Sequence, residues 1–426
     1  MTSVRFDPFS EQHRASPYPA YAELRRHAPV HRIEKSGAWA ISRYADVSFV
    51  LRHPELFSSS AMRTMMATGF SSSAGASGMG LAGVDAARLG ELLRTLPMSV
   101  TEMLRARSLI SADPPVHGPL RSLVNRGFTP RRIAELEPRI REIARASLED
   151  VGEKGELDLV EDFAIPLPVT VIAELLGVEP ERKEDFKRWS DCAVAGATGA
   201  SGGLRPETLF QAFAELGAYM TGVIEARRSD PRDDLISTLI RAENGEAGLT
   251  PVEIVMFTLL LLVAGNETTT NLLGNAMLAL LAHPRELARV QRDPSLIPLL
   301  VEEALRFDGP VQFVMRSATR DVEIAGARIP AGATVMPLIG SANRDEAQFA
   351  DPDRFDVARN PQGHIAFGLG IHFCLGASLA RLEARVALEE LLTRFSRFER
   401  LEPGVEYIDS FLVRGPKHVR LRVEAA

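Results

Sequence analysis

The chain carries one of its 2 cysteines in the stretch Phe367-Gly368-Leu369-Gly370-Ile371-His372-Phe373-Cys374-Leu375-Gly376, between closely spaced glycines. Glycine suits a tight loop whose backbone must come close to a flat or bulky group. From Leu379 to Leu392 apolar residues recur at helical spacing, so we expect a helix to follow the loop. Unpaired backbone N–H groups at a helix start favour a negatively charged sulfur. The stretch therefore predicts a rigid loop that presents Cys374.

The cysteine count limits what this sulfur can bind. With only Cys192 and Cys374, the chain cannot form a four-cysteine zinc or iron–sulfur site by itself. A haem iron needs one axial thiolate and no other sulfur. A buried free thiol is the alternative, and it is the usual state of a lone cysteine. The pattern F-G-x-G-x-H-x-C-x-G favours the ligand, because it is complete here and resembles the haem-binding loop of the cytochrome P-450 family.

Length and composition describe a globular chain of 426 residues, 45% hydrophobic and 25% charged. Length alone suggests about two or three domains. The net charge of -7 argues against nucleic acid as a partner. The first residues hold no apolar run that could act as a signal or membrane anchor, and the longest run, at about 254–265, is too short to span a bilayer. With few cysteines, these features predict a soluble, cytoplasmic protein.

A long apolar helix is expected from Thr250 to about His283. Thr250, Pro251 and Glu253 are typical of a capped helix start. The middle of the helix, Ala264-Gly265-Asn266-Glu267-Thr268-Thr269-Thr270, puts polar groups into a core, which is costly unless they find partners. A polar patch satisfied within the core is one interpretation. The other is functional, because the stretch resembles the family's oxygen-binding segment A-G-x-[DE]-T.

Several basic residues also match the family. His117 and Arg121 are four apart in an expected helix and so share one face, which by itself indicates only an exposed polar face. Arg316 by itself is an ordinary charge on a strand. The resemblance implies that His117, Arg121, Arg316 and His372 bind the haem propionates.

Glu303 and Arg306 are three apart in a helix that is expected to end near Phe307. Such a pair is commonly a surface ion pair of little energetic weight. In the family, however, this pair lies beneath the haem-binding loop and is tied to a later arginine. Arg354 is the candidate for that arginine here.

Residues 58–111 have an unusual composition, with serine- and glycine-rich stretches and a leucine repeat at helical spacing. Six of the chain's 12 methionines lie there: Met62, Met65, Met66, Met79, Met98 and Met103. The segment is either a surface insertion with a small core of its own or an adaptable apolar lid over a pocket, since thioether side chains repack easily. Further along, the glycine-rich residues 196–203 predict a loop between two helices.

The matches to the family run from about Asp113 to Leu392. They imply one large, mainly helical domain with small β-sheets over residues 1–426, with the 58–111 segment as a lid-like insertion. They also imply haem b held by Cys374, with Ala264, Gly265, Phe367, Gly368 and Gly376 around the cofactor. A soluble bacterial-type enzyme of this family receives electrons from a separate ferredoxin or flavodoxin with its reductase.

The family's chemistry is consistent with these residues. A thiolate opposite bound O2 donates electron density and favours O–O cleavage. Glu267 is expected to relay protons, and Thr268 to hold oxygen or a nearby water by hydrogen bonding. The substrate pocket is expected to include Leu260, Val263, Val311 and Phe411. The expected reaction is hydroxylation or epoxidation of a hydrophobic small molecule of secondary metabolism, such as a terpenoid, fatty acid or polyketide.

Two other functions stay open for such a protein: a haem-thiolate peroxygenase or isomerase, and a haem sensor or carrier without turnover. The Glu267–Thr268 pair favours the monooxygenase, because a carrier or a peroxide user has less need of a proton relay. A cysteine hydrolase without haem is the least consistent alternative, because His372 is only two residues from Cys374 and no third member of a triad is evident.

Overall fold

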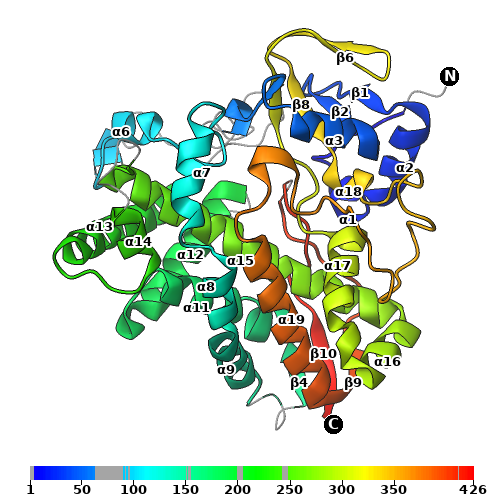
Figure 1. Cartoon of the computed structure of the whole chain (residues 1–426). Coiled ribbons are helices and arrows are strands. Elements are labelled where there is room, and N and C mark those ends of the chain that lie inside the picture. The colour runs from blue at the N-terminus through cyan, green and yellow to red at the C-terminus, as the bar shows by residue number, and fades with distance from the viewer. Residues whose placement is uncertain are drawn as a thin grey trace. The chain divides into compact units, whose positions relative to one another are not determined.

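The computed structural model describes most of the 426-residue chain. The described residues are 4–62, 90–91, 93–94, 96–149, 151, 155–198, 205–241, 248–410 and 412–426. The chain divides into two compact units, whose elements are labelled in Figure 1. Unit 1 contains Met1–Ser58, Pro130–Pro168 and Glu267–Ala426, and unit 2 contains Ser59–Thr129 and Val169–Asn266.

The largest sheet of unit 1 has five strands in the order β1-β2-β8-β5-β3. The β2–β8 pair is parallel and the other pairs are antiparallel. The strands are β1 (Val30–Arg32), β2 (Trp39–Ile41), β3 (Phe57–Ser58), β5 (Arg316–Ala318) and β8 (Thr334–Pro337). Helix α3 (Tyr44–Arg52) packs on this sheet, because Val47, Val50 and Leu51 form one apolar face three and four residues apart.

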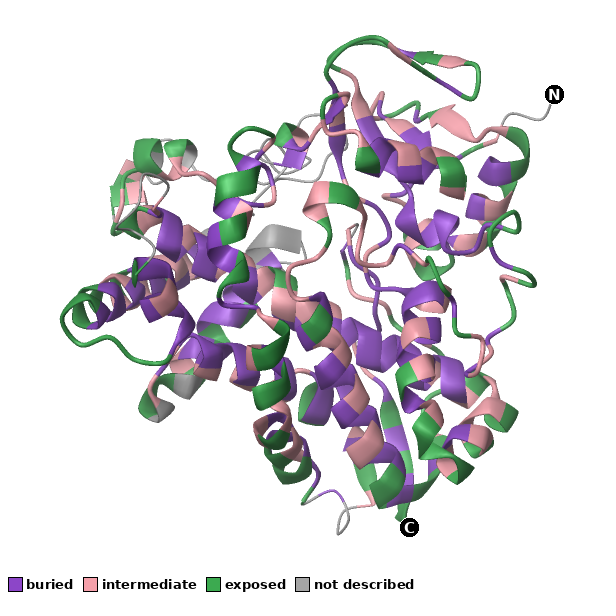
Figure 2. Cartoon of the chain, viewed as in Figure 1, coloured by how far each residue is buried: buried purple, intermediate pink, exposed green. Residues whose placement is uncertain are grey.

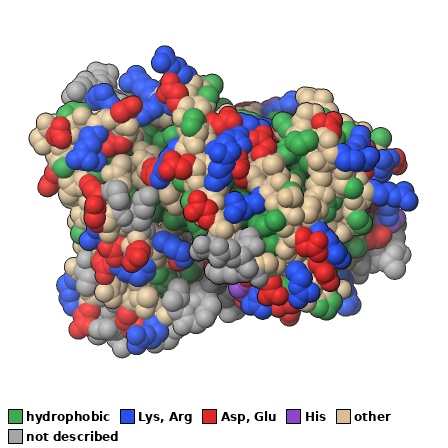
Figure 3. Space-filling view, turned by 90° about the horizontal axis from the view of Figure 1, so that it is seen from below, with side chains coloured by type: hydrophobic (Ala, Val, Ile, Leu, Met, Phe, Trp, Pro, Cys, Tyr) green, Lys and Arg blue, Asp and Glu red, His purple; other side chains and the backbone are tan. Residues whose placement is uncertain are grey.

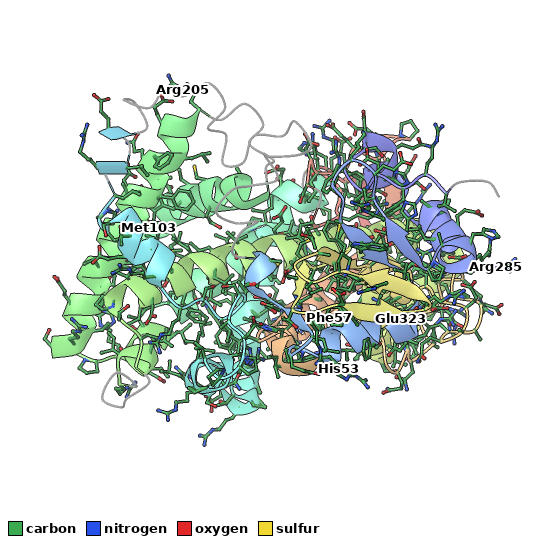
Figure 4. The ribbon with its side chains drawn as sticks, turned by 90° about the horizontal axis from the view of Figure 1, so that it is seen from above. His53, Phe57, Met103, Arg205, Arg285 and Glu323 are labelled. Carbon is green, nitrogen blue, oxygen red and sulfur yellow. The ribbon has the colours of Figure 1, made fainter. Side chains whose placement is uncertain are left out.

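Two smaller sheets complete the β-structure described in unit 1. The first has the antiparallel order β4-β10-β9, with β4 at Glu156–Asp158, β9 at Phe395–Arg400 and β10 at Arg420–Ala425. The second is the predicted hairpin of β6 (Val322–Ile324) and β7 (Ala327–Ile329). Ala325 and Gly326 have φ values of 48° and 78°, as a two-residue hairpin turn requires. Figure 4 labels Glu323 on this hairpin and Phe57 on β3.

Helix α19 carries the predicted apolar stripe of Leu379, Leu382 and Val386, and all three side chains are buried. Figure 2 shows that α19 has both buried and exposed residues along its length. Helix α9 packs beside it, and Arg141 of α9 reaches two carboxylates of α19, Glu389 at 2.6 Å and Glu390 at 2.7 Å. The described helices of unit 1 are α1 (Glu11–Ala15), α2 (Tyr18–His27), α3, α8 (Pro130–Glu135), α9 (Glu137–Leu148), η2 (Leu159–Ala164), α16 (Pro284–Arg292), η5 (Pro294–Leu296), α17 (Ile297–Asp308), α18 (Ile339–Ala342), η6 (Gly370–His372) and α19 (Ala377–Arg394).

Unit 2 is helical in its described part. Its elements are α6 (Val100–Arg105), α7 (His117–Asn125), η3 (Pro180–Arg182), α12 (Lys183–Thr198), α13 (Pro206–Ser229) and α14 (Leu235–Arg241), while α11 (Pro166–Leu175) begins in unit 1 and continues into unit 2. Helix α12 continues to Thr198 and so includes the first residues of the loop expected at 196–203, whose residues 199–203 lie outside the described residues. One glycine inside a helix costs only about 1 kcal/mol, which packing of α12 on α13 can offset.

Helix α15 (Pro251–Ala282) has 32 residues and belongs to unit 2 up to Asn266 and to unit 1 from Glu267. It begins with the predicted cap: the Thr250 N–H donates to Glu253 Oε2 at 2.9 Å, and the Glu253 N–H donates to Thr250 Oγ1 at 3.2 Å. One 18-residue window has a mean hydropathy of 1.4, so α15 could cross a membrane by length and composition. Half of that window is buried inside the protein, as expected for a core helix.

A buried ion cluster fixes α17. The Glu303 and Arg306 side chains are both 0% exposed, and Arg306 donates to the two Glu303 oxygens at 2.7 and 2.8 Å. The third member is Arg359, whose Nε donates to Glu303 Oε1 at 3.0 Å. The prediction of Arg354 was wrong. Its side chain is 64% exposed and pairs with Asp356, whereas its carbonyl oxygen accepts hydrogen bonds from both Arg306 and Arg359.

Replacing Arg359 by leucine should lower the free energy of unfolding by about 3 kcal/mol, because Glu303 would stay buried with one charge partner fewer. Arg354→Leu is the matched control and should change it by less than about 0.5 kcal/mol, since that side chain is largely in water. Urea denaturation followed by circular dichroism measures both. Equal losses in the two variants would contradict the assignment of Arg359.

Candidate active site

Cys374 lies between η6 and the start of α19, as predicted. Its backbone N–H donates to the Phe367 carbonyl oxygen at 2.9 Å, which closes the base of the loop. Gly368 and Gly370 have φ values of 72° and 70°, which residues with a Cβ rarely adopt. A Cβ on Gly370 would also come within 2.7 Å of the Leu51 carbonyl oxygen on α3. The loop is therefore tight and depends on its glycines.

The two cysteines differ in their surroundings. Cys374 is half-buried, whereas Cys192 is buried on α12. Burial raises the pKa of the Cys192 thiol, although Arg188 nearby lowers it. A thiol that resists ionisation is a poor metal ligand. Of the two sulfurs, Cys374 is the better placed to bind iron.

The predicted residues of α15 share one face of the helix. Val263 and Ala264 lie three and four residues after Leu260, and Glu267 and Thr268 lie three and four residues after Ala264; each of the five is half-buried or exposed. The other side of this part of the helix is buried and holds Leu261, Leu262, Asn266, Thr269 and Thr270. The helix thus leaves one face accessible at its centre, with apolar residues next to one acid and one hydroxyl.

Gly265 lies at the edge of that face. A Cβ there would meet Ile172 of α11 at 3.4 Å, which is ordinary van der Waals contact. Packing against α11 therefore does not by itself require glycine at this position, unlike the crowded and left-handed Gly370.

Burial raises the pKa of two carboxyl groups, one on α15 and one on α19, above their ordinary value. Burial raises the pKa of Glu267 to about 8. Glu383 of α19 accepts a hydrogen bond from Thr269 Oγ1 at 3.2 Å, and burial raises its pKa to about 8 although that hydrogen bond lowers it. An acid that keeps its proton near pH 7 can act as a proton donor.

The residues predicted to bind propionates occur in both units. In unit 1, Arg316 is 6% exposed on β5 and His372 is half-buried in η6. In unit 2, His117 and Arg121 lie four apart on α7, as predicted. Burial and the charge of Arg121 lower the pKa of His117, although Asp113 raises it. His117 is therefore a neutral hydrogen-bonding group, and Arg121 and Arg316 are cations.

Val311 lies where two distant segments of unit 1 meet. It forms an antiparallel bridge with Val413, and the Gln312 N–H donates to the Leu412 carbonyl oxygen at 3.2 Å. On the other side of the bridge, the Arg414 N–H donates to the Pro310 carbonyl oxygen at 2.7 Å. Phe411, predicted to line the pocket, lies outside the described residues, and its role stays a prediction.

The C-terminal part of the 58–111 segment is attached within unit 2, whereas Ser58 at its start belongs to β3 of unit 1. Pro97 lies so close to α13 that a Cβ on Gly217 would come within 2.5 Å of its ring. Arg107 donates through Nε and Nη2 to the two Glu253 oxygens at 2.7 and 2.8 Å. Ser99 and Glu102 form the predicted capping box. Residues 63–89 lie outside the described residues, so the lid stays a prediction.

These side chains fit a haem. One half-buried thiol on a glycine loop supplies the single axial ligand that haem iron needs. The arginines and histidines are the donors that bind carboxylates such as propionates. Among the described residues, no group of three or more His, Cys, Asp and Glu side chains could hold a bare metal ion.

The sequence model of the family described as Cytochrome P450 matches residues 207–422. The chain is also 38% identical to 6-deoxyerythronolide B hydroxylase of Saccharopolyspora erythraea, over 100% of both chains. It belongs to the cytochrome P450 family. A second relative, Cyclomarin C epoxidase CymV of Salinispora arenicola, is 39% identical over 94% of each chain. The structure of the cytochrome P450 CYP109Q5 from Chondromyces apiculatus is similar with a TM-score of 0.84 and 43% identity, over 99% of each chain.

Family membership confirms three expectations for this cytochrome P450. Its fold is mainly helical with small β-sheets, as the similar solved structure shows over nearly the whole chain. Its cofactor is haem b bound through a thiolate. Its activity is that of a monooxygenase, in agreement with relatives named as a hydroxylase and an epoxidase.

Sequence reasoning missed two residues around the α15 face of this cytochrome P450. Glu383 carried a usable signal, because it is an acid within the buried stripe of α19. Asn275 donates from Nδ2 to the carbonyl oxygens of Asp308 and Arg414 at 2.9 and 3.0 Å, and so ties α15 to two distant segments. Nothing in its local sequence indicates those partners.

The raised pKa of Glu383 makes stability depend on pH. Its ordinary value is 4.5 and its folded value about 8, so its contribution is complete below pH 4.5 and is lost as the pH rises towards 8. Glu383→Gln should therefore gain stability relative to the wild type between pH 5 and 8, by up to about 1.4 kcal/mol per pH unit. Urea midpoints across this range measure the difference.

The control for this experiment is Glu399→Gln, which changes an exposed carboxyl on β9. It should leave the pH dependence unchanged, because that carboxyl is already in water. If the urea midpoints of Glu383→Gln and the wild type changed with pH in the same way, the raised pKa of Glu383 would be refuted.

Proposed function

We propose that this cytochrome P450 hydroxylates or epoxidises a hydrophobic small molecule, with Cys374 as the axial ligand of its haem iron. The observation that carries the proposal is the Cys374 loop: a half-buried thiol just before a helix, on a backbone whose conformation at Gly368 and Gly370 residues with a Cβ rarely adopt. Cys192 has no such setting, because it is buried within α12. Phe367, Gly368 and Gly376 belong to the same loop and would face the cofactor.

The accessible face of α15 would deliver protons and leave room for O2. Haem with an axial thiolate supplies O–O bond cleavage when O2 binds. Glu267 keeps its proton at neutral pH and can release it on the accessible face of the helix. Thr268, the next residue, can pass that proton on or hold a water by its hydroxyl. Ala264 and Gly265 add little bulk there, which leaves room for O2.

Other side chains would hold the cofactor and the substrate. Arg316 and His372 of unit 1, with His117 and Arg121 of unit 2, are assigned to the propionates because they supply cationic and neutral hydrogen-bond donors. Leu260, Val263 and Val311 are assigned to the substrate, together with Phe411. These apolar side chains would exclude water from the reacting carbon and give no polar group to orient the substrate.

We infer the substrate class from that apolar lining and from two relatives. They are named for a hydroxylation of 6-deoxyerythronolide B and an epoxidation of cyclomarin C. A hydrophobic terpenoid, fatty acid or polyketide of secondary metabolism fits this setting. Within it, the neutral Glu267 next to Thr268 favours O2 as the oxidant, since a peroxide user does not need a proton donor in that place.

We infer that electrons come from a ferredoxin or a flavodoxin with its reductase, in the cytoplasm. On the face shown in Figure 3, the described basic and acidic side chains are interspersed. With a net charge of -7, this surface offers no extended basic face there of the kind that nucleic acid requires. A small acidic or neutral redox protein could dock through local ion pairs.

Cys374→Ala should abolish the thiolate-type absorption band of the reduced carbon monoxide complex, because no other residue of the loop offers sulfur to the iron. Cys192→Ala is the matched control and should keep the band at full intensity per haem. The measurement is a reduced-minus-oxidised carbon monoxide difference spectrum. The reverse result would refute the assignment of Cys374.

Thr268→Ala should keep haem and substrate binding but reduce product formed per reductant consumed by at least about 10-fold, since proton delivery is the step it would impair. The substrate for the assay is the compound in a terpene and fatty-acid library that gives the largest Soret shift. Thr270→Ala is the control, because Thr270 faces away and donates to the Ala164 carbonyl oxygen at 2.9 Å. Equal coupling in both variants would count against Thr268 as a relay.

A further inference from the structure

A cluster of three side chains lies behind the Cys374 loop and has no part in the mechanism above. Glu302 of α17 accepts two hydrogen bonds from Arg381 of α19, at 2.6 Å from Nε and 3.0 Å from Nη2. It also contacts His364 Nε2 at 2.8 Å. The side chains of His364 and Glu302 are 6% and 24% exposed, and that of Arg381 is 37% exposed, so water reaches the cluster mainly at the guanidinium. It joins α17, α19 and the chain that leads into the loop.

The hydrogen bonds fix the charges of this cluster. The Ala366 N–H donates to His364 Nδ1 at 3.3 Å, so we assign the proton to Nε2, which donates it to Glu302. Burial alone would raise the pKa of Glu302, but the hydrogen bonds from His364 and Arg381 lower it to about 2. The Glu302–Arg381 pair therefore contains one negative and one positive charge, which balance.

Arg381 also touches the loop itself. Its guanidinium lies over the Phe367 ring, 4.4 Å from the ring centre. The carbonyl oxygen of Phe367 is the group that accepts the Cys374 N–H at 2.9 Å. The Phe367 ring lies 6.3 Å from the rings of both His364 and Phe373. A fixed cation thus stacks on the residue that closes the base of the cysteine loop, and the Glu302 carboxylate holds that cation in place.

We propose that Glu302 and Arg381 are positioning residues for the Cys374 loop whose balanced charges set the reduction potential of the haem iron. The proposal rests on the assignment of Cys374 as the axial ligand. Reduction adds an electron to the iron–thiolate unit, so an unbalanced cation nearby would favour the reduced state and an unbalanced anion would oppose it. If the pair only held the loop in shape, the reduction potential would not depend on the sign of the charge that is left unbalanced.

The test is a set of dye-mediated redox titrations of the haem-loaded protein at pH 8. Glu302→Gln should raise the potential, because it leaves Arg381 unbalanced, and Arg381→Gln should lower it. Each shift should be on the order of tenfold in the ratio of reduced to oxidised haem, or about 59 mV for one electron. The double variant Glu302→Gln/Arg381→Gln should return close to the wild-type value.

Three further variants separate charge from shape. Arg381→Lys keeps the cation and should stay near the wild-type potential, and His364→Gln keeps a hydrogen-bond donor towards Glu302 and should do the same. Asp321→Asn changes a charge of the same size on the exposed Arg328–Asp321 pair of the β6–β7 hairpin and should have no effect. If Glu302→Gln does not load haem, the two Arg381 variants still test the proposal, because the potential should fall in Arg381→Gln and stay unchanged in Arg381→Lys. The Arg381 side chain is 37% exposed, so its replacement disturbs the core less.

Every variant is first checked for the thiolate-type band of its reduced carbon monoxide complex. If Cys374→Ala kept that band, the ligand assignment would fail, whatever the potentials. If the band behaved as proposed but Glu302→Gln and Arg381→Gln shifted the potential in the same direction or not at all, the charge balance would be refuted while Cys374 stood. Opposite shifts that cancel in the double variant would support it.

Discussion

Leaving buried polar groups on α15 without partners is costly, and the hydrogen bonds that these groups form connect the helix to much of the chain. In unit 2, Asn266 donates to Ser190 Oγ at 2.6 Å. In unit 1, Thr269 donates to Glu383, Thr270 to the Ala164 carbonyl oxygen, and Asn275 to the carbonyl oxygens of Asp308 and Arg414. An unpaired buried group costs about 1–3 kcal/mol, so each partner segment is held to the helix at a defined position. The polar residues on the accessible face are then left for chemistry.

The same division between structural and chemical groups is seen around the cysteine loop. Gly370 gives the backbone room against α3, and the Phe367 carbonyl oxygen anchors the Cys374 N–H. Two groups of charges lie on the side of α17: the buried Glu303 and Arg306 with Arg359, and next to them the half-buried Glu302 with Arg381. Two adjacent carboxylates of α17 thus bind different parts of the chain. Glu303 holds the loop after α18 through Arg359, and Glu302 holds Arg381, which lies over the loop that carries the cysteine.

What the sequence could predict was local or strongly patterned. The cap at Thr250, the stripe on α19 and the turn of the β6–β7 hairpin follow from spacing within a few residues. The family resemblance predicted the haem cofactor, but it did not show whether Arg354 or Arg359 binds Glu303. That choice depends on how residues 351–359 fold back, because Arg359 is held by the carbonyl oxygens of Ala350, Asp351 and Arg354. The Glu302–Arg381 ion pair could not be predicted from local spacing either, since 79 residues separate its members.

Glu253 links local unfolding at two places that are far apart in the sequence. Its Oε2 accepts the Thr250 N–H that caps α15, and the same carboxylate accepts three hydrogen bonds from Arg107. The carboxylate is 5% exposed, so water cannot readily replace either partner. The first turn of α15 and the chain around Arg107 therefore form one cooperative unit, although 146 residues separate them. Amide hydrogens at the two places should exchange with solvent through a shared opening event, and a ligand that orders one of them would slow exchange at the other.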